Sequence, residues 1–369
     1  MEINFTTDYS LIIAKLSEID PIKYAKTRNY INGAISYLSP YISRGVISTK
    51  EVLDKAMQQG FTTYQIEPFI KELCWRDYFQ RVAQVKNLRT DIKQPQPFIN
   101  NYEIPISVIE ANTGIEGIDN SIKRLYQTGY MHNHCRMYTA SIICNIARSH
   151  WALPSNWMYY HLLDGDFASN TGSWQWVAGA NSNKLYYANQ ENINKYTFTN
   201  QRNTFLDNSY EALALLAVPA VLSNTNTPSF VTPLNEINTQ ELYIDNTFPT
   251  YIYNYYNLDP KWHEQEKGNR ILLLDPLHFT DYPINSNCLA FMLNLSKNIK
   301  DIQIFIGSFA TLVSKYTIQQ IFYKEHPLNK DYKGNEESRD WIDEDTMGYF
   351  PSFFAYWKQV EKKLKKRYE

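Results

Sequence analysis

The stretch that decides the fold is Asp164–Trp176, DGDFASNTGSWQW. Two carboxylates flank a glycine, and a run of Ser, Asn, Thr and Gly leads from them into a helix that carries two tryptophans. Asp-x-Asp with oxygen-rich neighbours also occurs in divalent-metal loops, but the acidic residue that closes a calcium-binding loop is missing. A polar loop before a helix N-terminus is better suited to hydrogen-bonding a polar heteroaromatic ring.

A second motif, ELCWRDYF, spans Glu72–Phe79. On a helix its Glu72, Trp75 and Arg76 fall three or four residues apart and therefore share one face. A face that combines a carboxylate, an indole and a guanidinium is too polar for a core stripe. The simpler interpretation is a partly exposed face with an ordinary Glu–Arg pair, and the spacing alone leaves it open.

A third motif, TGYMHNHCRM, spans Thr128–Met137. Its Thr-Gly pair ends one helix, and the next helix begins at once with Asn133, Arg136 and Met137 on one face. Helix capping explains a start rich in His and Asn equally well. Neither this motif nor ELCWRDYF predicts a function by itself.

The composition is that of a globular protein, and 369 residues are enough for one large or two ordinary domains. Lys and Arg number 36 against 38 Asp and Glu, and this balance argues against a surface covered in basic charge. Met1–Tyr9 has no cationic run followed by an apolar core, so we expect no secretory signal. No apolar run reaches the roughly 18 residues that a membrane span needs. The four cysteines lack metal-site spacing, so we expect no metal and a cytoplasmic protein with reduced thiols.

The sequence predicts three segments. Residues 1–215 carry apolar residues at helical spacing, and residues 216–265 are rich in Asn, Thr and Pro and are expected to form an extended linker. Residues 266–369 alternate helical stretches with apolar runs that begin at Arg270, Asp301 and Ile318, a pattern typical of a parallel sheet. The expected fold is an all-helical domain followed by a small C-terminal α/β domain with a parallel sheet.

Taken in order, with RNYINGAISYLSPYISRGVIS (Arg28–Ser48) before them, these motifs resemble the helical half of the DNA photolyase and cryptochrome family. The resemblance covers residues 24–197 and is specific, because the family's motifs occur here in the family's order. It implies a helical domain that holds FAD in a bent pose. It also implies an enzyme, a deoxyribodipyrimidine photolyase, that acts on damaged DNA.

The resemblance implies the cofactor contacts residue by residue. The phosphates and ribose of FAD would lie against Tyr24, Ser36, Leu38 and Ser39, with a charge-assisted contact from Arg76. The flavin ring would lie beside a buried ion pair of Arg136 with Asp164, and would contact Asp166 and Asn133. Asn170 would face flavin N5, a position where plant cryptochromes carry Asp instead.

The resemblance also implies a pocket for a cyclobutane pyrimidine dimer that is flipped out of the DNA. Its contacts would be Glu72, Asn133 and Met137, between walls formed by the rings of Trp75 and Trp176. Glu72 would hydrogen-bond the dimer as negative charge develops on it. Relatives that repair the pyrimidine–pyrimidone adduct carry His where this chain has Asn133 and Met137, which favours dimer repair.

Two tryptophans match the family's electron relay, which re-reduces the light-excited flavin. Trp174 matches the member next to the flavin and Trp151 the middle member, although core packing is the simpler interpretation of any one Trp. No Trp stands where a third, surface member is expected, and only Tyr102 is nearby in the sequence.

The leading hypothesis is a monomeric enzyme in which blue light excites reduced FAD, an electron passes to the dimer, the dimer splits and the electron returns. The alternative is a cryptochrome-like photoreceptor that binds FAD without repair, and a helical scaffold that has lost FAD is a third interpretation. The loss of cationic positions, such as the usual Arg at His134, weakens the case for tight DNA binding. We expect no antenna domain before the helical one; the C-terminal α/β segment is faintly similar to the later half of that domain.

Overall fold

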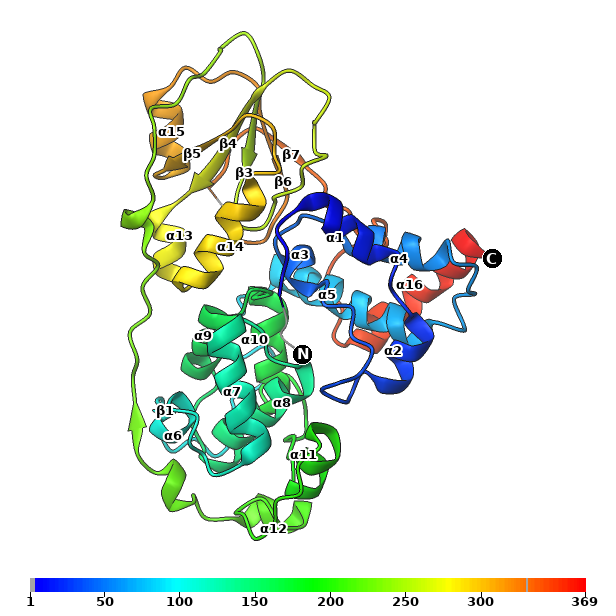
Figure 1. Ribbon diagram of the computed structural model, residues 1–369, viewed down its shortest axis with the longest axis vertical. Helices are drawn as coiled ribbons and strands as arrows, with labels where there is room; N and C mark the ends of the chain where they lie inside the picture. Colours follow the sequence, from blue (N-terminus) through cyan, green and yellow to red (C-terminus); the bar gives the residue numbers. More distant parts are fainter. Residues whose placement is uncertain (1–3, 330) are drawn as a thin grey trace. The chain divides into compact units, whose positions relative to one another are not determined.

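The computed structural model describes residues 4–329 and 331–369. These residues form two compact units, and each unit is assembled from separate stretches of the chain (Figure 1). Unit 1 contains Met1–Ile22, Ser36–Val85 and Val231–Glu369, and unit 2 contains Lys23–Ile35 and Lys86–Phe230. Helix α2 (Pro21–Thr27) begins in unit 1 and ends in unit 2.

Unit 2 is mainly helical. Its described elements are β1 (Ile104–Pro105), α6 (Ile106–Ile109), α7 (Glu116–Thr128), α8 (Asn133–Ser141), a π-helical turn η1 (Ile142–Ile146), α9 (Ala152–His161), α10 (Phe167–Val177), α11 (Gln190–Thr197), α12 (Tyr210–Leu215), a 3₁₀ turn η2 (Ala220–Leu222) and β2 (Thr225–Asn226), which pairs antiparallel with β1. Helix α7 ends at Gly129, whose left-handed φ of 69° is a common way to close a helix.

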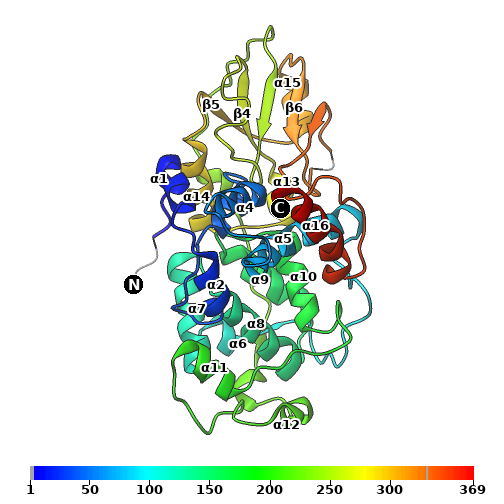
Figure 2. The same cartoon turned by 90° about the vertical axis from the view of Figure 1, so that its right-hand side faces the viewer.

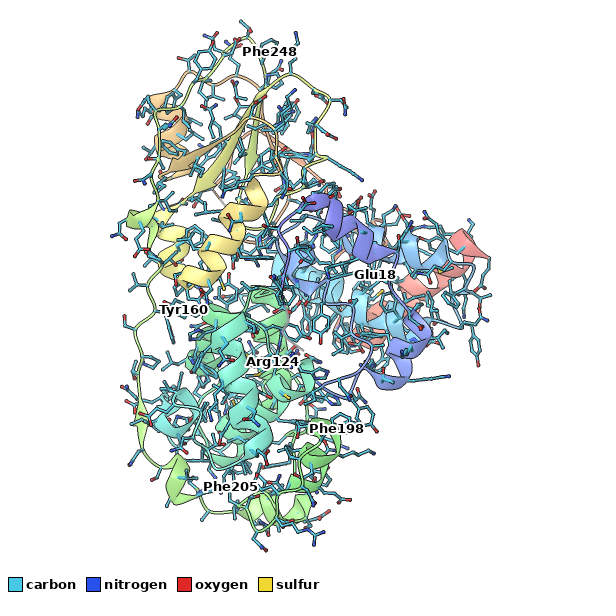
Figure 3. The ribbon with its side chains drawn as sticks, viewed as in Figure 1. Glu18, Arg124, Tyr160, Phe198, Phe205 and Phe248 are labelled. Carbon is cyan, nitrogen blue, oxygen red and sulfur yellow. The ribbon has the colours of Figure 1, made fainter. Side chains whose placement is uncertain are left out.

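One apolar core holds these helices together. Ile118 and Ile122 from α7 and the apolar residues of η1 belong to it, and the indoles of Trp151, Trp157 and Trp174 are buried in the same cluster. Phe205 packs on this core as a partly buried ring (Figure 3). Continuous apolar packing of this kind fixes the positions of the polar side chains that α8 and α10 carry.

The helical part of unit 1 comprises α1 (Tyr9–Leu16), α3 (Ser39–Ser43), α4 (Thr49–Met57), α5 (Glu67–Val85) and α16 (Phe353–Tyr368). A reciprocal capping box of Ser48 with Glu51 begins α4. Helix α16 contacts α5, although the two lie far apart in the sequence (Figure 2).

A buried carboxylate joins three segments of unit 1. Asp77 of α5 is fully buried, and its carboxylate accepts hydrogen bonds from Thr49 Oγ1 at 2.9 Å and from the Ile342 backbone N–H at 3.0 Å. Burial raises the pKa of Asp77, because the low-dielectric interior disfavours the charged form. The two hydrogen bonds oppose that effect and tie the segment before α16 to α4 and α5.

The remainder of unit 1 is an α/β layer. Within the described residues its parallel sheet has five strands in the order β5 (Ile302–Ile306), β4 (Asn269–Leu274), β3 (Thr250–Tyr253), β6 (Ile321–Lys324) and β7 (Asn335–Glu337). The 3₁₀ turn η3 (Leu234–Glu236) precedes β3, helices α13 (Pro276–Asp281) and α14 (Ser286–Ser296) join β4 to β5, and α15 (Phe309–Lys315) joins β5 to β6. This strand order is that of a doubly wound sheet.

The structure confirms the predicted fold class, a helical part combined with a small parallel α/β part. The strands predicted from Arg270, Asp301 and Ile318 are present as β4, β5 and β6. The predicted boundaries at 216 and 266 do not coincide with the limits of the two units. The central strand β3 lies inside the predicted linker. Its four residues are all buried, but a run of four residues is too short to stand out in the sequence.

No helix in residues 4–329 and 331–369 is both long and apolar enough to cross a membrane. In the same residues, no group of three or more His, Cys, Asp or Glu side chains is placed to hold a metal ion. The cysteine side chains at positions 74, 135, 144 and 288 are buried and serve as small apolar residues.

Candidate functional site

The predicted site residues are divided between the two units. Unit 2 carries Tyr24, Asn133, Arg136, Met137, Trp151, Asp164, Asp166, Asn170, Trp174 and Trp176. Unit 1 carries Ser36, Leu38, Ser39, Glu72, Trp75 and Arg76.

An ion pair with a buried carboxylate links α8 to the loop before α10 in unit 2. Arg136 Nη2, from α8, donates to both carboxylate oxygens of Asp164, at 3.0 and 2.9 Å, and Arg136 Nε donates to the Met131 carbonyl at 2.7 Å. The Asp164 side chain is only 4% exposed and that of Arg136 is 21% exposed. The pair predicted from the resemblance is therefore present, and the Met131 carbonyl, which the sequence did not indicate, fixes the orientation of the guanidinium.

Asp166 begins helix α10. Its Oδ1 accepts a hydrogen bond from the Ser169 backbone N–H at 2.7 Å, which is the geometry of an N-cap. The negative charge also lies at the positive end of the helix dipole. The carboxylate predicted to contact the flavin ring thus has a structural role as well.

Asn170 lies on the first turn of α10 with its amide held in one orientation. Its Nδ2 donates to both the carbonyl and the hydroxyl of Ser155, each at 3.0 Å. Since the amide nitrogen is committed to Ser155, Oδ1 is the atom of this side chain that remains as an acceptor. Ser155 lies within α9 and the sequence did not single it out as a site residue, because its contact with Asn170 depends on the packing of two helices.

Asn133 and Met137 lie one turn apart on α8, as the motif predicts. Asn133 is exposed, whereas Met137 is half-buried and packs on the core of unit 2. They can therefore present an amide and a soft apolar side chain on the same helix face, next to Arg136.

The three tryptophans of unit 2 that the motifs indicate divide into one surface ring and two core rings. Trp176 is 39% exposed, with its ring 5.7 Å from that of Tyr186. Trp174 and Trp151 are 2% and 3% exposed. Trp176 is thus accessible from the solvent and the other two rings lie in the core, and the roles predicted for the three rings stay predictions.

In unit 1, Ser39 begins the short helix α3 after the buried Leu38, and Arg76 Nη1 donates to Ser43 Oγ at 2.7 Å. Arg76 therefore has a hydrogen-bond partner at the end of α3, the helix that Ser39 begins. The sequence predicts phosphate contacts for these residues, which stay predictions.

Trp75 has an aromatic neighbour that the sequence did not indicate. The ring of Phe353, from α16, stacks on it with 3.9 Å between centroids and 9° between planes, and Phe79 lies 5.5 Å away. One face of a ring predicted to pack on a lesion is thus occupied by a residue of the same unit. Glu72, on the same helix, is half-buried.

His132 begins helix α8 as a neutral ring. Its Nδ1 accepts from the His134 backbone N–H at 3.2 Å, and its side chain is 6% exposed. Burial lowers the pKa of His132 from 6.5 to about 4, and the neighbouring His134 and Arg136 add to this effect. A buried ring that cannot take up a proton makes the stability of unit 2 depend on pH.

We expect unit 2 to lose stability as the pH falls from 6.5 to 4. In that window the unfolded chain binds a proton at this position and the folded chain does not, so protonation favours unfolding. The loss from this one residue should be about 3 kcal/mol. His132→Asn keeps a capping acceptor but does not titrate, so its unfolding free energy, measured by urea denaturation, should vary less with pH. An equal pH dependence in both proteins would contradict this assignment.

Comparison with known proteins finds similarity over part of this chain. Residues 69–205 match the family model described as the FAD binding domain of DNA photolyase. A deoxyribodipyrimidine photo-lyase of Alkalihalophilus pseudofirmus is 30% identical over 160 residues, 41% of this chain and 33% of that protein. The protein of the same name from Neurospora crassa is 31% identical over 170 residues, 42% of this chain and 28% of that protein.

This chain thus aligns with about a third of the length of these curated relatives. Among solved structures, a Synechocystis cryptochrome is 25% identical with a TM-score of 0.46, covering 53% of this chain and 46% of that chain. Residues 69–205 are thus similar to the FAD binding domain of DNA photolyase, and the chain resembles curated photolyases over about two fifths of its length.

Proposed function

We propose that this protein is a light-dependent flavoenzyme that repairs cyclobutane pyrimidine dimers in DNA. The observation that carries the proposal is the polar set of unit 2, in which the buried Arg136–Asp164 pair is retained and the amide of Asn170 is oriented by Ser155. These groups fit FAD, because a flavin ring presents both N–H donors and carbonyl acceptors at its polar edge. When bound, FAD would supply one-electron chemistry driven by light.

The residues of the chain would bind and orient the reactants. Asn170 Oδ1 would accept a hydrogen bond from the flavin, since the amide nitrogen is held by Ser155. The Arg136–Asp164 pair would supply fixed charges that need no reorganisation during the reaction. A neutral amide at Asn170, rather than an ionisable carboxyl, supports a reduced flavin without offering a proton.

The residues for the lesion would act through stacking and hydrogen bonding. The exposed ring of Trp176 is suited to packing against a flipped base, which offsets part of the cost of extruding it. Asn133 is exposed and can hydrogen-bond a pyrimidine edge, and Met137 can adapt its shape to the dimer. Having Asn133 and Met137 rather than His favours the dimer over the pyrimidine–pyrimidone adduct.

A photoreceptor that binds FAD without repair is the second candidate. The stacking of Phe353 on Trp75 favours it, because that contact covers one face of a predicted lesion wall. If the rings of Trp75 and Phe353 stay stacked when DNA binds, the lesion cannot pack on this face of Trp75. Removing Phe353 therefore distinguishes the candidates: Phe353→Ala should raise repair in a photolyase restrained by this contact and leave a photoreceptor inactive.

Glu72 provides the sharpest test of repair. Flavin-loaded, chemically reduced protein should restore a dimer-containing oligonucleotide under blue light, and Glu72→Ala should lower the yield about tenfold while FAD stays bound. The reason is the loss of a hydrogen bond to a group that becomes charged, worth about 1.5 kcal/mol or more. Product is measured by chromatography of the oligonucleotide.

The matched control is Glu67→Ala. Glu67 lies on the same helix, where its carboxylate forms an ion pair with Lys71 one turn away. Its removal should leave the yield within a factor of two, since exposed pairs of this kind contribute little. No repair by the wild-type protein would exclude the enzyme and leave the photoreceptor.

A further inference from the structure

Three aromatic rings of unit 2 lead from the solvent to the core. The ring of Tyr102 stacks on His150 with 5.1 Å between centroids and 29° between planes, and His150 lies 5.3 Å from Trp151 at 34°. Tyr102 is 67% exposed and Trp151 is 3% exposed. The array therefore connects the surface with the buried ring that matches the middle member of an electron relay.

Backbone pairing builds this stack. Asn101 forms a parallel bridge with Ser149, its carbonyl accepts from the His150 N–H at 2.9 Å, and its Oδ1 accepts from Ser149 Oγ at 3.0 Å. The preceding Asn100 N–H donates to the Arg148 carbonyl at 2.7 Å. Since both residues next to Tyr102 and His150 are fixed, the two rings are held face to face.

The surroundings of Trp151 favour loss of an electron. Trp151 Nε1 donates to Asp91 Oδ1 at 2.6 Å, so a carboxylate lies beside the indole and stabilises positive charge on it. The loop that carries Asp91 is held by Gln175, which accepts from the Ile92 N–H at 2.8 Å and donates to the Thr90 carbonyl at 3.1 Å. Gln175 directly follows Trp174, which lies in the same core.

The ring of His150 is suited to pass an electron between its neighbours rather than to carry a positive charge itself. Its Nδ1 lies 3.3 Å from the Ala152 N–H as an acceptor, and burial lowers its pKa below the ordinary 6.5, although Asp91 opposes this. The ring is therefore neutral at pH 7. A neutral ring between Tyr102 and Trp151 places no positive charge against an oxidised indole.

We propose that Tyr102 is the surface electron donor of this protein and takes the place of the missing third tryptophan. The inference rests on the proposed light-driven flavoenzyme. With oxidised FAD bound, its light-excited flavin would be the acceptor that takes one electron from the buried tryptophans and leaves Trp151 oxidised. One electron then passes from Tyr102, through the stacked ring of His150, to Trp151. The phenol O–H bond breaks, its proton goes to the surrounding water, and a dissolved thiol later returns one electron and one proton to the tyrosyl radical.

Flash photolysis of the FAD-loaded protein with a spin trap tests this proposal. In the wild type, electron paramagnetic resonance should show a tyrosyl radical, and mass spectrometry should locate the trap adduct on Tyr102. In Tyr102→Phe the adduct should be absent and the tryptophan radical should live at least about tenfold longer. Tyr102→Trp should restore the fast decay, because an oxidisable ring is again present.

Tyr64→Phe is the matched control. Tyr64 is 78% exposed, and its replacement should leave both radical lifetime and adduct as in the wild type. Equal decay of the tryptophan radical in Tyr102→Phe and the wild type would overturn the proposal. So would a wild type that forms no tryptophan radical, and repair by the chemically reduced wild type then decides separately whether the proposed function stands.

Discussion

Asp164→Asn should destabilise unit 2 by about 3 kcal/mol and reduce its retention of FAD. The variant keeps the shape of the side chain but leaves the guanidinium of Arg136 without its counter-charge, and removing one partner of a buried pair typically costs about 3 to 5 kcal/mol. The lower value applies because the Arg136 side chain is 21% exposed, so water offsets part of the loss. Urea denaturation followed by tryptophan fluorescence measures the stability, and the absorbance of the purified protein measures bound flavin.

Asp166→Asn is the matched control, two residues along the same loop. Asn is as good an N-cap as Asp, so the hydrogen bond to the Ser169 N–H survives and the stability should change by less than about 1 kcal/mol. The double variant Arg136→Met with Asp164→Leu should recover most of the stability lost in Asp164→Asn, since no unpaired charge remains. If both Asp→Asn variants were equally stable, the ion pair would not be a main support of the loop.

Gly129→Ala should cost about 3 kcal/mol, for two separate reasons. The residue has a φ of 69°, where a Cβ adds roughly 1 kcal/mol of strain. A Cβ there would also lie 2.5 Å from Leu163 Cγ, and overpacking of this kind costs about 1 to 3 kcal/mol. Leu163 directly precedes Asp164, so the displacement would reach the ion pair. Urea denaturation measures the change.

Two further variants separate the backbone strain from the clash with Leu163. Gly114 has a φ of 79°, and a Cβ at this position would meet no other atom within 4 Å, so Gly114→Ala should show the backbone strain alone, about 1 kcal/mol. Adding Leu163→Ala to Gly129→Ala removes the clash but leaves a smaller core residue, so the two changes should be clearly non-additive. Additive effects would mean that the methyl group at position 129 does not press on Leu163.

The sequence predicted the parts of the fold that depend on local pattern. The strands β4, β5 and β6 are apolar runs bounded by turn residues, and their positions follow from that pattern alone. Strand β3 was missed because it has four residues among Asn, Tyr and Pro, and it is a strand only by virtue of its two parallel neighbours. The grouping of α16 with α5 was missed for the same reason, since it is a contact between distant segments.

For the candidate site, too, the local motifs predicted some residues and missed others. The motifs indicated Arg136, Asp164 and Asn170 by number, because a family pattern preserves residue types at fixed spacing. They could not indicate Ser155 or Asp91, whose roles arise only where helices and loops meet in space. Nor could they indicate that Phe353 stacks on Trp75, since no local pattern connects two residues so far apart in the chain.

The hydrogen bond between Asp77 and Ile342 has a consequence for how the chain is made. Thr49 and helix α5 leave the ribosome long before Ile342, so the carboxylate of Asp77 lacks the second of these two hydrogen bonds while all of Lys86–Phe230 is synthesised. During that interval the stretch Lys86–Phe230 already has most of the residues of its own core, whereas α5 still lacks its contact with α16 and the hydrogen bond from Ile342. We therefore expect unit 2 to fold before unit 1 is complete. The nascent chain most needs protection from aggregation until the segment with Ile342 packs on α5.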